Sequence, residues 1–172
     1  MTGIALTLHN LNETEVLARR VASLCGCGET ITLRGTLGTG KTAFARAFIR
    51  HFTPDAEEVV SPTFSLLQVY PCHPERSEGS PAAGDPSPTA QDDNYGEIWH
   101  LDLYRLKSAE EALEIGIEDG WERAILLIEW PEVIEHLLPA NRLDITMEYG
   151  AKPDERVVNL QPHGTWINKL SS

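Results

Sequence analysis

The sequence lacks long apolar runs and contains few cysteines. No stretch approaches the roughly 18 apolar residues that a bilayer-spanning helix needs. Residues 1–10 lack the basic flank and the long apolar segment of a signal peptide. The three cysteines are odd in number and include no Cys-x2-Cys pair, which disfavours a disulfide framework or a zinc site. We therefore expect a cytoplasmic protein with reduced thiols and no membrane association.

Basic residues are also scarce. The chain has 14 lysines and arginines against 26 acidic residues, a formal net charge of −12. A surface of this charge repels nucleic-acid phosphate, so we expect any connection with RNA to run through a partner protein. With 172 residues, 41% of them hydrophobic, the chain can bury the core of one domain, which we place at residues 1–172.

The most informative feature present is a phosphate-binding loop. Gly35-Thr-Leu-Gly-Thr-Gly-Lys-Thr42 matches Gly-x4-Gly-Lys-Thr and lies between a strand-like run at 30–34 and a helix-like run at 42–51. Its glycines let backbone N–H groups surround a polyphosphate, Lys41 adds a positive charge near the β- and γ-oxygens, and Thr42 can ligate Mg²⁺. The strand–loop–helix context favours a nucleotide site over a plain glycine-rich turn.

Apolar periodicity and capping residues predict the other elements. One helix is expected at 12–25, with Asn12 as its cap, and another at 108–115, with Ser108 as its cap. The apolar residues at helical spacing in the first are Leu11, Val16, Leu17, Val21 and Leu24. Strands are expected at 6–8, 30–34, 63–70, 97–103, 124–128, 142–149 and 156–160. The strands at 63–70 and 97–103 resemble a hairpin whose turn has been greatly lengthened.

Residues 71–94 form that lengthened connection. The segment contains five prolines, and its five carboxylates against one arginine give a charge of −4. Its few large apolar side chains cannot offset the entropy of ordering, so we expect a disordered surface insertion, with a binding loop as the alternative. At its end, Asp93-Asn-Tyr-Gly96 matches the Asp-x-x-Gly pattern of GTPases in its letters only, because it lies in low-complexity sequence. No guanine-reading Asn-Lys-x-Asp exists in the chain, which disfavours a signalling GTPase.

Two carboxylates follow apolar strand patterns. Glu129 ends the continuous apolar run Ala124-Ile-Leu-Leu-Ile128, the position where a phosphate-loop protein places its metal-binding acid. The alternative is that Glu129 merely begins the next turn. Asp102 alternates with apolar residues of its strand, so it and His100 face away from them. Near the phosphates Asp102 could orient the metal or the attacking water; otherwise it is an ordinary solvated or ion-paired residue.

Four segments together resemble a known family. They are Gly35-Thr-Leu-Gly-Thr-Gly-Lys-Thr-Ala-Phe44, Ser61-Pro-Thr-Phe64, His100-Leu-Asp-Leu-Tyr-Arg-Leu106 and Ile128-Glu-Trp-Pro-Glu132. They are similar to the signature blocks of the TsaE family, the bacterial ATPase subunit of the machinery that makes threonylcarbamoyladenosine in tRNA. The similarity covers residues 11–160 apart from the insertion.

This resemblance implies a P-loop NTPase-like α/β fold, with a mixed β-sheet flanked by helices. It also implies ATP and Mg²⁺ as cofactors, weak hydrolysis by the subunit alone, and a complex with two partner proteins. Those partners transfer the threonylcarbamoyl group to the adenosine beside the anticodon of tRNAs that read codons starting with A. The subunit would support turnover of that complex and would meet tRNA only indirectly.

The resemblance and the residue chemistry assign the same site. Catalytic roles fall to Lys41, Asp102 and Glu129, and Mg²⁺ ligation falls to Thr42 and Glu129. Thr63 resembles a switch residue that senses the γ-phosphate, or else is a hydroxyl that starts a strand. Trp130 resembles a family tryptophan near the nucleotide, or else is a buried aromatic. The residues expected to bind the cofactor are Gly35, Gly38, Thr39, Gly40, Lys41, Thr42, Ala43, Thr63 and Trp130. Of the loop residues, Leu37, Thr39 and Ala43 are expected to contribute backbone only.

Two other functions stay open at this point. A small-molecule kinase would share the phosphate loop, but the chain lacks an arginine-rich lid segment that would clamp a transferred phosphoryl group. A nucleotide-binding scaffold that does not hydrolyse differs from an ATPase only in its rate with partners present. No side chain reveals the base, so the preference for ATP over GTP rests on the resemblance.

Overall fold

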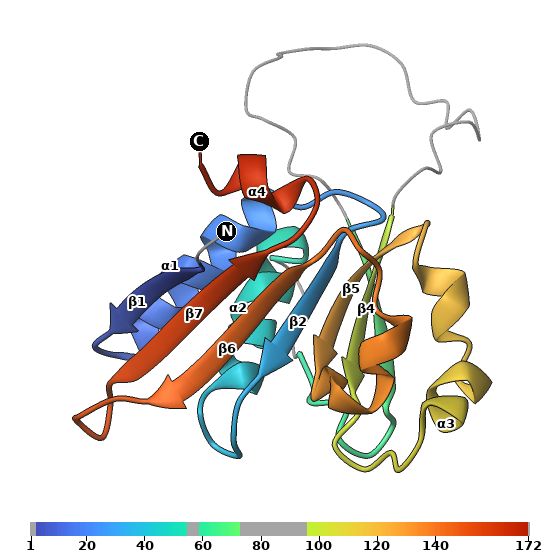
Figure 1. The fold of residues 1–172 in the computed structure, drawn as a ribbon, viewed down its shortest axis with the longest axis horizontal. Helices are drawn as coiled ribbons and strands as arrows, with labels where there is room; N and C mark the ends of the chain where they lie inside the picture. Colours follow the sequence, from blue (N-terminus) through green and yellow to red (C-terminus); the bar gives the residue numbers. More distant parts are fainter. Residues whose placement is uncertain (1–2, 55–58, 73–95, 172) are drawn as a thin grey trace.

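The computed structural model describes residues 3–54, 59–72 and 96–171. Within these residues a seven-stranded mixed sheet in the order β1-β7-β6-β2-β5-β4-β3 carries helices on both faces (Figure 1). The predicted α/β fold with a mixed sheet is therefore confirmed. The strands are β1 (Ile4–Leu8), β2 (Thr30–Arg34), β3 (Leu67–Pro71), β4 (Glu97–Asp102), β5 (Ala124–Glu129), β6 (Leu143–Tyr149) and β7 (Arg156–Pro162). The helices are α1 (Leu11–Ser23), α2 (Lys41–Phe52), α3 (Ala109–Glu114) and α4 (Trp166–Lys169), with 3-10 turns η1 (Ile117–Gly120) and η2 (Pro131–Leu137).

The centre of the sheet is parallel and its two margins are antiparallel. β2 pairs in parallel with β5 and with β6, and β4 pairs in parallel with β5. β1, β7 and β6 pair antiparallel on one side, as do β3 and β4 on the other. Because parallel strands end at the same edge, the phosphate loop after β2 lies beside Glu129 at the end of β5 and Asp102 at the end of β4.

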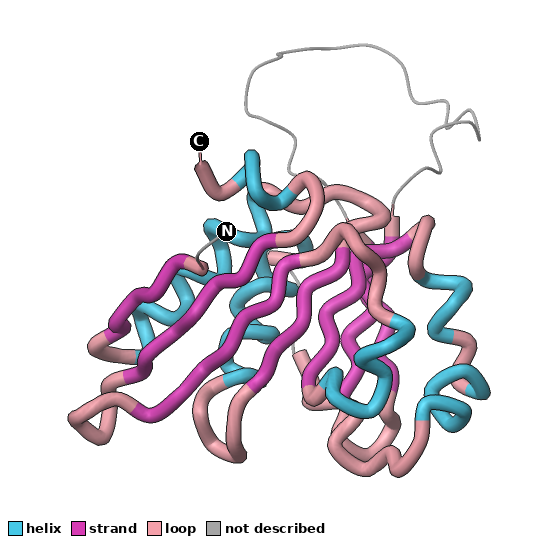
Figure 2. The backbone as a smooth tube through the Cα atoms, viewed as in Figure 1, coloured by secondary structure: helices cyan, strands magenta, loops and turns pink. Residues whose placement is uncertain are grey.

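The sheet divides the core into two layers (Figures 1 and 2). Ile125 and Leu127 of β5 pack in the layer that contains α1, α2 and Trp166 of α4, whereas Leu126 and Ile128 pack with α3, η1 and η2. All six residues of β5 are buried. This double burial explains why its sequence is continuously apolar up to Glu129.

The cap of α1 lies two residues earlier than predicted, because Asn10 and not Asn12 caps the helix. The Asn10 side chain accepts a hydrogen bond from the Glu13 backbone N–H at 3.0 Å, and the Glu13 carboxylate accepts one from the His9 N–H at 2.8 Å. Asn10 thus satisfies a free N–H of the first turn, and Glu13 satisfies the N–H of the residue just before the cap.

The buried face of α1 differs in part from the prediction. Val21 is buried and Leu17 and Leu24 pack half-buried against the core as expected, whereas Leu11 and Val16 are exposed. The other buried residues of the helix are Thr14, Ala18 and Ala22. α1 and α2 pack against each other, and small side chains allow this close approach. The sequence pattern overvalued the large apolar residues of α1.

The strand predicted at 63–70 is shorter than expected. Residues 62–65 form turns and β3 begins only at Leu67, because Leu66 adopts a left-handed conformation (φ 65°) and its N–H bonds to the Pro62 carbonyl at 2.6 Å. The antiparallel pairing of β3 with β4 is confirmed. Pro71 ends β3, and the predicted insertion from residue 73 onward lies outside the described residues.

Three helical segments were not predicted, namely η1, η2 and α4. Each is short, four to seven residues, so periodicity gives little signal. In the described part of the chain, no helix combines the length and apolarity needed to cross a bilayer.

Candidate nucleotide site

The loop between β2 and α2 depends on glycine. Gly35, Gly38 and Gly40 adopt φ values of 127°, 81° and 105°, a region that side chains disfavour. A side chain at Gly35 would also collide with the backbone carbonyl of Met147 on β6. The loop can therefore fold tightly over the end of the sheet, with its N–H groups available for an anion at the start of α2.

Lys41 lies buried across the mouth of this loop. Its Nζ donates hydrogen bonds to the carbonyls of Gly35 at 2.7 Å and Thr36 at 2.8 Å, and sits 3.9 Å from the centre of the Trp130 ring. Burial lowers the pKa of Lys41, an effect that the nearby carboxylates, above all Glu129, oppose. The ammonium is thus held where phosphate oxygens could replace the two carbonyls as its partners.

Glu129 is the most enclosed carboxylate of the site, with 1% of its surface exposed. Thr42, in the first turn of α2, donates its hydroxyl to Glu129 Oε2 at 3.1 Å. On the other oxygen, His100 Nε2 lies 2.9 Å from Oε1. The structure therefore joins the two residues predicted to ligate a metal, Thr42 and Glu129, and adds a histidine behind them.

Asp102 holds the turn that carries Thr63. Thr63 donates its hydroxyl to Asp102 Oδ2 at 2.8 Å and shares a 2.8 Å hydrogen bond with the hydroxyl of Ser61. The Tyr104 backbone N–H donates to Asp102 Oδ1 at 3.1 Å. Asp102 is buried, so it is not the solvated strand residue of the alternative reading, and Thr63 lies in a turn and does not start a strand.

Trp130 follows Glu129 in a left-handed backbone conformation, φ 57°, which is uncommon for a large residue. Its N–H donates to the Leu33 carbonyl of β2 at 3.1 Å, which helps to hold this conformation. The ring then turns toward the phosphate loop, beneath the Lys41 ammonium and 4.8 Å from the ring of Tyr104. Trp130 is half-buried, so it belongs to the mouth of the site and not to the core.

These groups surround a cavity of about 290 Å³. Most of the predicted site residues line it, whereas Gly35 and Thr39 do not. The Thr39 side chain is fully buried, and its hydroxyl donates to the Thr36 carbonyl at 2.9 Å. The lining residues are Leu37, Gly38, Gly40, Lys41, Thr42, Ala43, Thr63, Asp102, Tyr104, Arg105, Glu129 and Trp130.

Sequence reasoning gave no role to Tyr104, Arg105 or His100. Tyr104 packs on Trp130, and the Arg105 guanidinium lies 4.4 Å from the centre of the exposed Phe64 ring. One feature of the sequence could have pointed to them: all three lie within three residues of Asp102, at the end of a strand that reaches the phosphate loop. Their contacts depend on strand register and turn geometry, which the sequence alone does not reveal.

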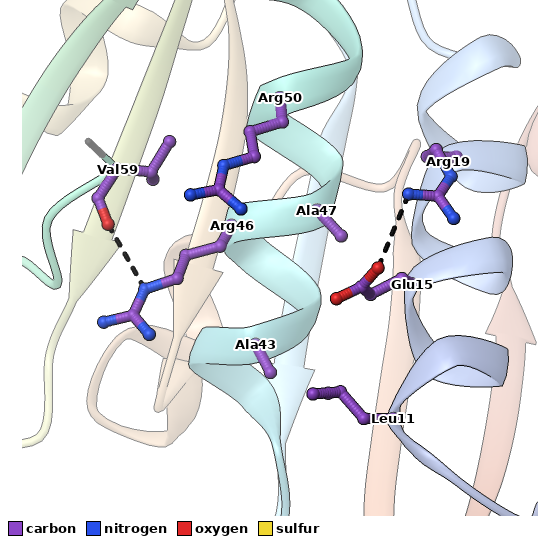
Figure 3. A pocket seen from close by; sticks show the side chains of 8 residues that line it. All are labelled: Leu11, Glu15, Arg19, Ala43, Arg46, Ala47, Arg50 and Val59. Atoms are coloured by element: carbon purple, nitrogen blue, oxygen red, sulfur yellow. Dashed lines mark hydrogen bonds and ion pairs between the residues drawn. The ribbon is translucent and has the colours of Figure 1, made fainter. Parts of the chain in front are cut away.

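Two further hollows lie near the first cavity, and one of them borders the phosphate loop. One, of about 400 Å³, shares Gly40 with the first cavity and is lined by Asn10, Leu11, Thr14, Thr39, Gly40, Asp154 and Arg156. The other, of about 370 Å³, lies over α1 and α2 (Figure 3). There Arg46 donates to the Val59 carbonyl at 3.2 Å and Arg19 pairs with Glu15 at 3.6 Å, next to Arg50. This arginine-lined hollow offers neither a nucleophile nor paired carboxylates, so the candidate chemistry stays at the loop.

The donor set at the loop suits Mg²⁺ held together with a phosphate. Among the described residues, no group of three or more His, Cys, Asp or Glu side chains is arranged to hold a metal by itself. Mg²⁺ usually binds proteins through one or two carboxylates plus substrate phosphates and water. The hydroxyl of Thr42 and the carboxylate of Glu129 supply such a partial set of hard oxygen donors.

Comparisons with known proteins identify the family. A family model described as "Threonylcarbamoyl adenosine biosynthesis protein TsaE" matches residues 8–158. The chain is 37% identical over 143 residues to the tRNA threonylcarbamoyladenosine biosynthesis protein TsaE of Rickettsia felis, a match that covers 83% of this chain and 71% of the relative. The protein of the same name from Rickettsia bellii is 35% identical over 153 residues, covering 89% and 91%. The one from Bacillus subtilis is 28% identical over 162 residues, covering 94% and 87%.

A solved structure supports the fold. The crystal structure of Bacillus subtilis YdiB superposes with a TM-score of 0.69, covering 99% of this chain and 94% of that chain at 23% identity. This likeness bears on the fold alone. The family match over most of the length, together with relatives above 30% identity, shows that this chain belongs to the TsaE family of threonylcarbamoyl adenosine biosynthesis proteins.

Proposed function

We propose that this protein is the Mg²⁺-dependent ATPase subunit of the machinery that forms threonylcarbamoyladenosine in tRNA. The observation that carries the proposal is the cavity where Lys41, Thr42 and Glu129 converge, with Thr42 bonded to Glu129 at 3.1 Å. The relatives are named for tRNA threonylcarbamoyladenosine biosynthesis, which supports the pathway. The phosphate loop supports nucleotide binding.

In this proposal the phosphates lie over the loop. Backbone N–H groups from Gly38 to Ala43 and the start of α2 face the anion, and the Lys41 ammonium moves from the loop carbonyls to phosphate oxygens. Thr42 and Glu129 would hold Mg²⁺, which when bound neutralises charge that develops on the phosphates. Leu37 contributes only backbone.

Asp102 and Thr63 are the two residues that we propose act at the terminal phosphate. Their side chains lie on the same cavity as Lys41, bonded to each other at 2.8 Å. Asp102 would orient the attacking water, because an ionised carboxylate accepts hydrogen bonds from it. Thr63, on a turn and not in a strand, would reorient when a phosphate oxygen competes for its hydroxyl.

The nucleoside would extend into the hollow lined by Asn10, Thr14, Asp154 and Arg156, because that hollow shares Gly40 with the phosphate cavity. Arg156 is fixed there by a 3.0 Å hydrogen bond from its Nε to the Thr39 carbonyl. The proposed preference for adenine over guanine rests on the resemblance to the family alone. Arg156 and Asp154 are the residues whose exchange tests this placement.

Two partner proteins would carry the transfer to tRNA, and this subunit would support their turnover. The net charge of −12 opposes direct tRNA binding, so contact with tRNA is proposed to be indirect. The small-molecule kinase alternative receives no support from the relatives, all of which carry biosynthesis names. A scaffold that binds nucleotide without hydrolysing it differs from an ATPase only in the rate of ATP hydrolysis.

The test is hydrolysis of Mg-ATP by the purified protein, alone and with its two candidate partners. We expect slow turnover alone and faster turnover with both partners. Lys41→Ala is the control for contaminating ATPases, since it should remove the activity while the variant stays folded. Absence of hydrolysis both alone and with the partners, with nucleotide still bound, would support the scaffold and overturn the ATPase.

A further inference from the structure

A histidine lies directly behind the proposed metal-binding carboxylate. His100 on β4 has no exposed surface, and its Nε2 is 2.9 Å from Glu129 Oε1. In the parallel pairing of β4 and β5, Asp102 is the register partner of Glu129. His100, two residues earlier, points to the same face and meets Glu129 diagonally. His100 does not line the nucleotide cavity.

This position is otherwise apolar. Ile98 on the same strand and Leu127, the register partner of His100, belong to the core layer beneath α2. A polar ring in such a layer needs a partner, because an unsatisfied polar group loses its hydrogen bonds to water. The only hydrogen bond found for His100 within the described residues is the one to Glu129.

The direction of that hydrogen bond follows from its surroundings. An ionised carboxylate only accepts hydrogen bonds, so Nε2 must carry the proton. His100 Nδ1 is buried without a partner in the described part of the chain, so Nε2 is the ring nitrogen that makes the hydrogen bond. Glu129 therefore receives one donor on each oxygen, His100 on Oε1 and Thr42 on Oε2.

We propose that His100 is a positioning residue for the nucleotide site, an inference that rests on the function proposed above. By donating to Oε1 it fixes the plane of the Glu129 carboxylate in a site almost closed to water. Oε2 then stays directed at Thr42 and the place where Mg²⁺ would bind. Partners that orient metal ligands in this way typically change metal affinity or activity by about 10- to 100-fold when removed.

Two substitutions separate this role from simple packing. His100→Leu removes the donor and keeps an apolar side chain in an apolar layer. His100→Gln keeps a donor, because the Gln amide nitrogen is the same number of bonds from Cβ as the histidine Nε2. Leu101→Val is the matched control, since Leu101 is equally buried on the same strand but faces the opposite layer.

We expect His100→Leu to lower kcat with partners, and the Mg²⁺ affinity of the ADP complex, by about 10- to 100-fold. Binding of a fluorescent ADP analogue without Mg²⁺ should stay close to the parent value. His100→Gln should recover most of the loss, and Leu101→Val should leave both quantities near the parent. A Gln variant as impaired as the Leu variant, or a Leu variant no worse than Leu101→Val, would overturn the proposal.

A spectroscopic measurement on the unmodified protein gives a second readout. With ¹⁵N-labelled histidine, NMR of the metal-free protein should show His100 with its proton on Nε2, and Glu129→Gln should perturb that signal. A proton on Nδ1 alone would contradict the proposal even if His100→Leu fails to fold. If the parent hydrolyses no ATP with its partners but the Nε2 proton and the Mg²⁺ effect on ADP binding hold, the ATPase proposal fails and the positioning role stands.

Discussion

Replacing Glu129 by Gln removes one charge and almost no volume. Both Glu129 oxygens accept hydrogen bonds, from Thr42 at 3.1 Å and from His100 at 2.9 Å. A hydrogen bond to a charged group contributes about 1.5–3 kcal/mol and a neutral one about 0.5–1.5 kcal/mol, so the two bonds together lose roughly 2 kcal/mol. The neutral amide is cheaper to bury, which offsets part of this loss. We therefore expect a folded variant whose free energy of unfolding falls by less than about 2 kcal/mol.

The effect on Mg²⁺ should be larger. Two unit charges 4 Å apart attract by about 4 kcal/mol at an effective dielectric constant of 20, which corresponds to about a thousand-fold in affinity. Because Mg²⁺ carries two charges, this figure is a lower bound on the attraction, before the cost of removing water from the ion. Mg²⁺-dependent hydrolysis should therefore fall by about three orders of magnitude, while nucleotide binding without Mg²⁺ changes little. The assay combines phosphate release with titration of a fluorescent ADP analogue at increasing Mg²⁺.

Glu132→Gln supplies the matched control. Glu132 is an exposed carboxylate three residues further along, at 3.9 Å from Arg34, so its removal changes the local charge without touching Thr42 or His100. It should leave Mg²⁺ affinity near the parent value. If Glu129→Gln weakens hydrolysis and Mg²⁺-free binding equally, Glu129 is structural and the metal assignment is wrong.

Three other predictions follow from the same structure. Lys41→Ala should abolish ATP turnover, because it removes the ammonium held at the loop, while circular dichroism and Tm show an intact fold; turnover at the parent rate would contradict the loop assignment. Burial raises the pKa of Asp144, but the hydroxyl of Thr32 and the guanidinium groups of Arg142 and Arg34 outweigh it and hold that pKa below its ordinary value. The stabilisation is therefore present above the unfolded pKa of about 3.9 and is lost as the pH falls through the lower folded value. Asp144→Asn should thus lower the free energy of unfolding by about 1–3 kcal/mol at pH 6 and by less at acidic pH, measured with urea; a difference that does not vary with pH would refute this. Replacing residues 73–94 by Asn-Gly should keep the β3–β4 pairing and slightly raise Tm, because a shorter loop costs less closure entropy. Loss of partner-stimulated hydrolysis in that folded variant would identify a docking loop.

The central strands were predictable because independent signals agree there. β2 was expected at 30–34 and is observed at Thr30–Arg34, since an apolar run meets a fixed loop motif. β5 follows from continuous apolar sequence, which only a strand buried on both faces requires. Helix α2 was expected from 42 and begins one residue earlier.

Other features depend on contacts that a single sequence does not display. The turn at 63–66 was mistaken for a strand because its apolar alternation is real, yet Leu66 turns left-handed and Phe64 is 85% exposed. In the site, the identities of Lys41, Thr42 and Glu129 came from motif and strand pattern. The bond between His100 and Glu129 required the register of two strands, and the contact of Tyr104 with Trp130 required the turn after β4.

The contact of the Lys41 ammonium with the Trp130 ring should make the fluorescence of this tryptophan sensitive to the position of the ammonium. Indole emission is sensitive to a neighbouring cation, and this ammonium lies 3.9 Å from the ring centre. An anion that draws the ammonium off the ring must therefore change the emission of that one chromophore. The other three tryptophans sit elsewhere, Trp99 and Trp166 buried in opposite core layers and Trp121 half-buried beside η1. Exchanging those three for phenylalanine would leave a single emitter at the nucleotide cavity, able to follow phosphate arrival in real time without a label.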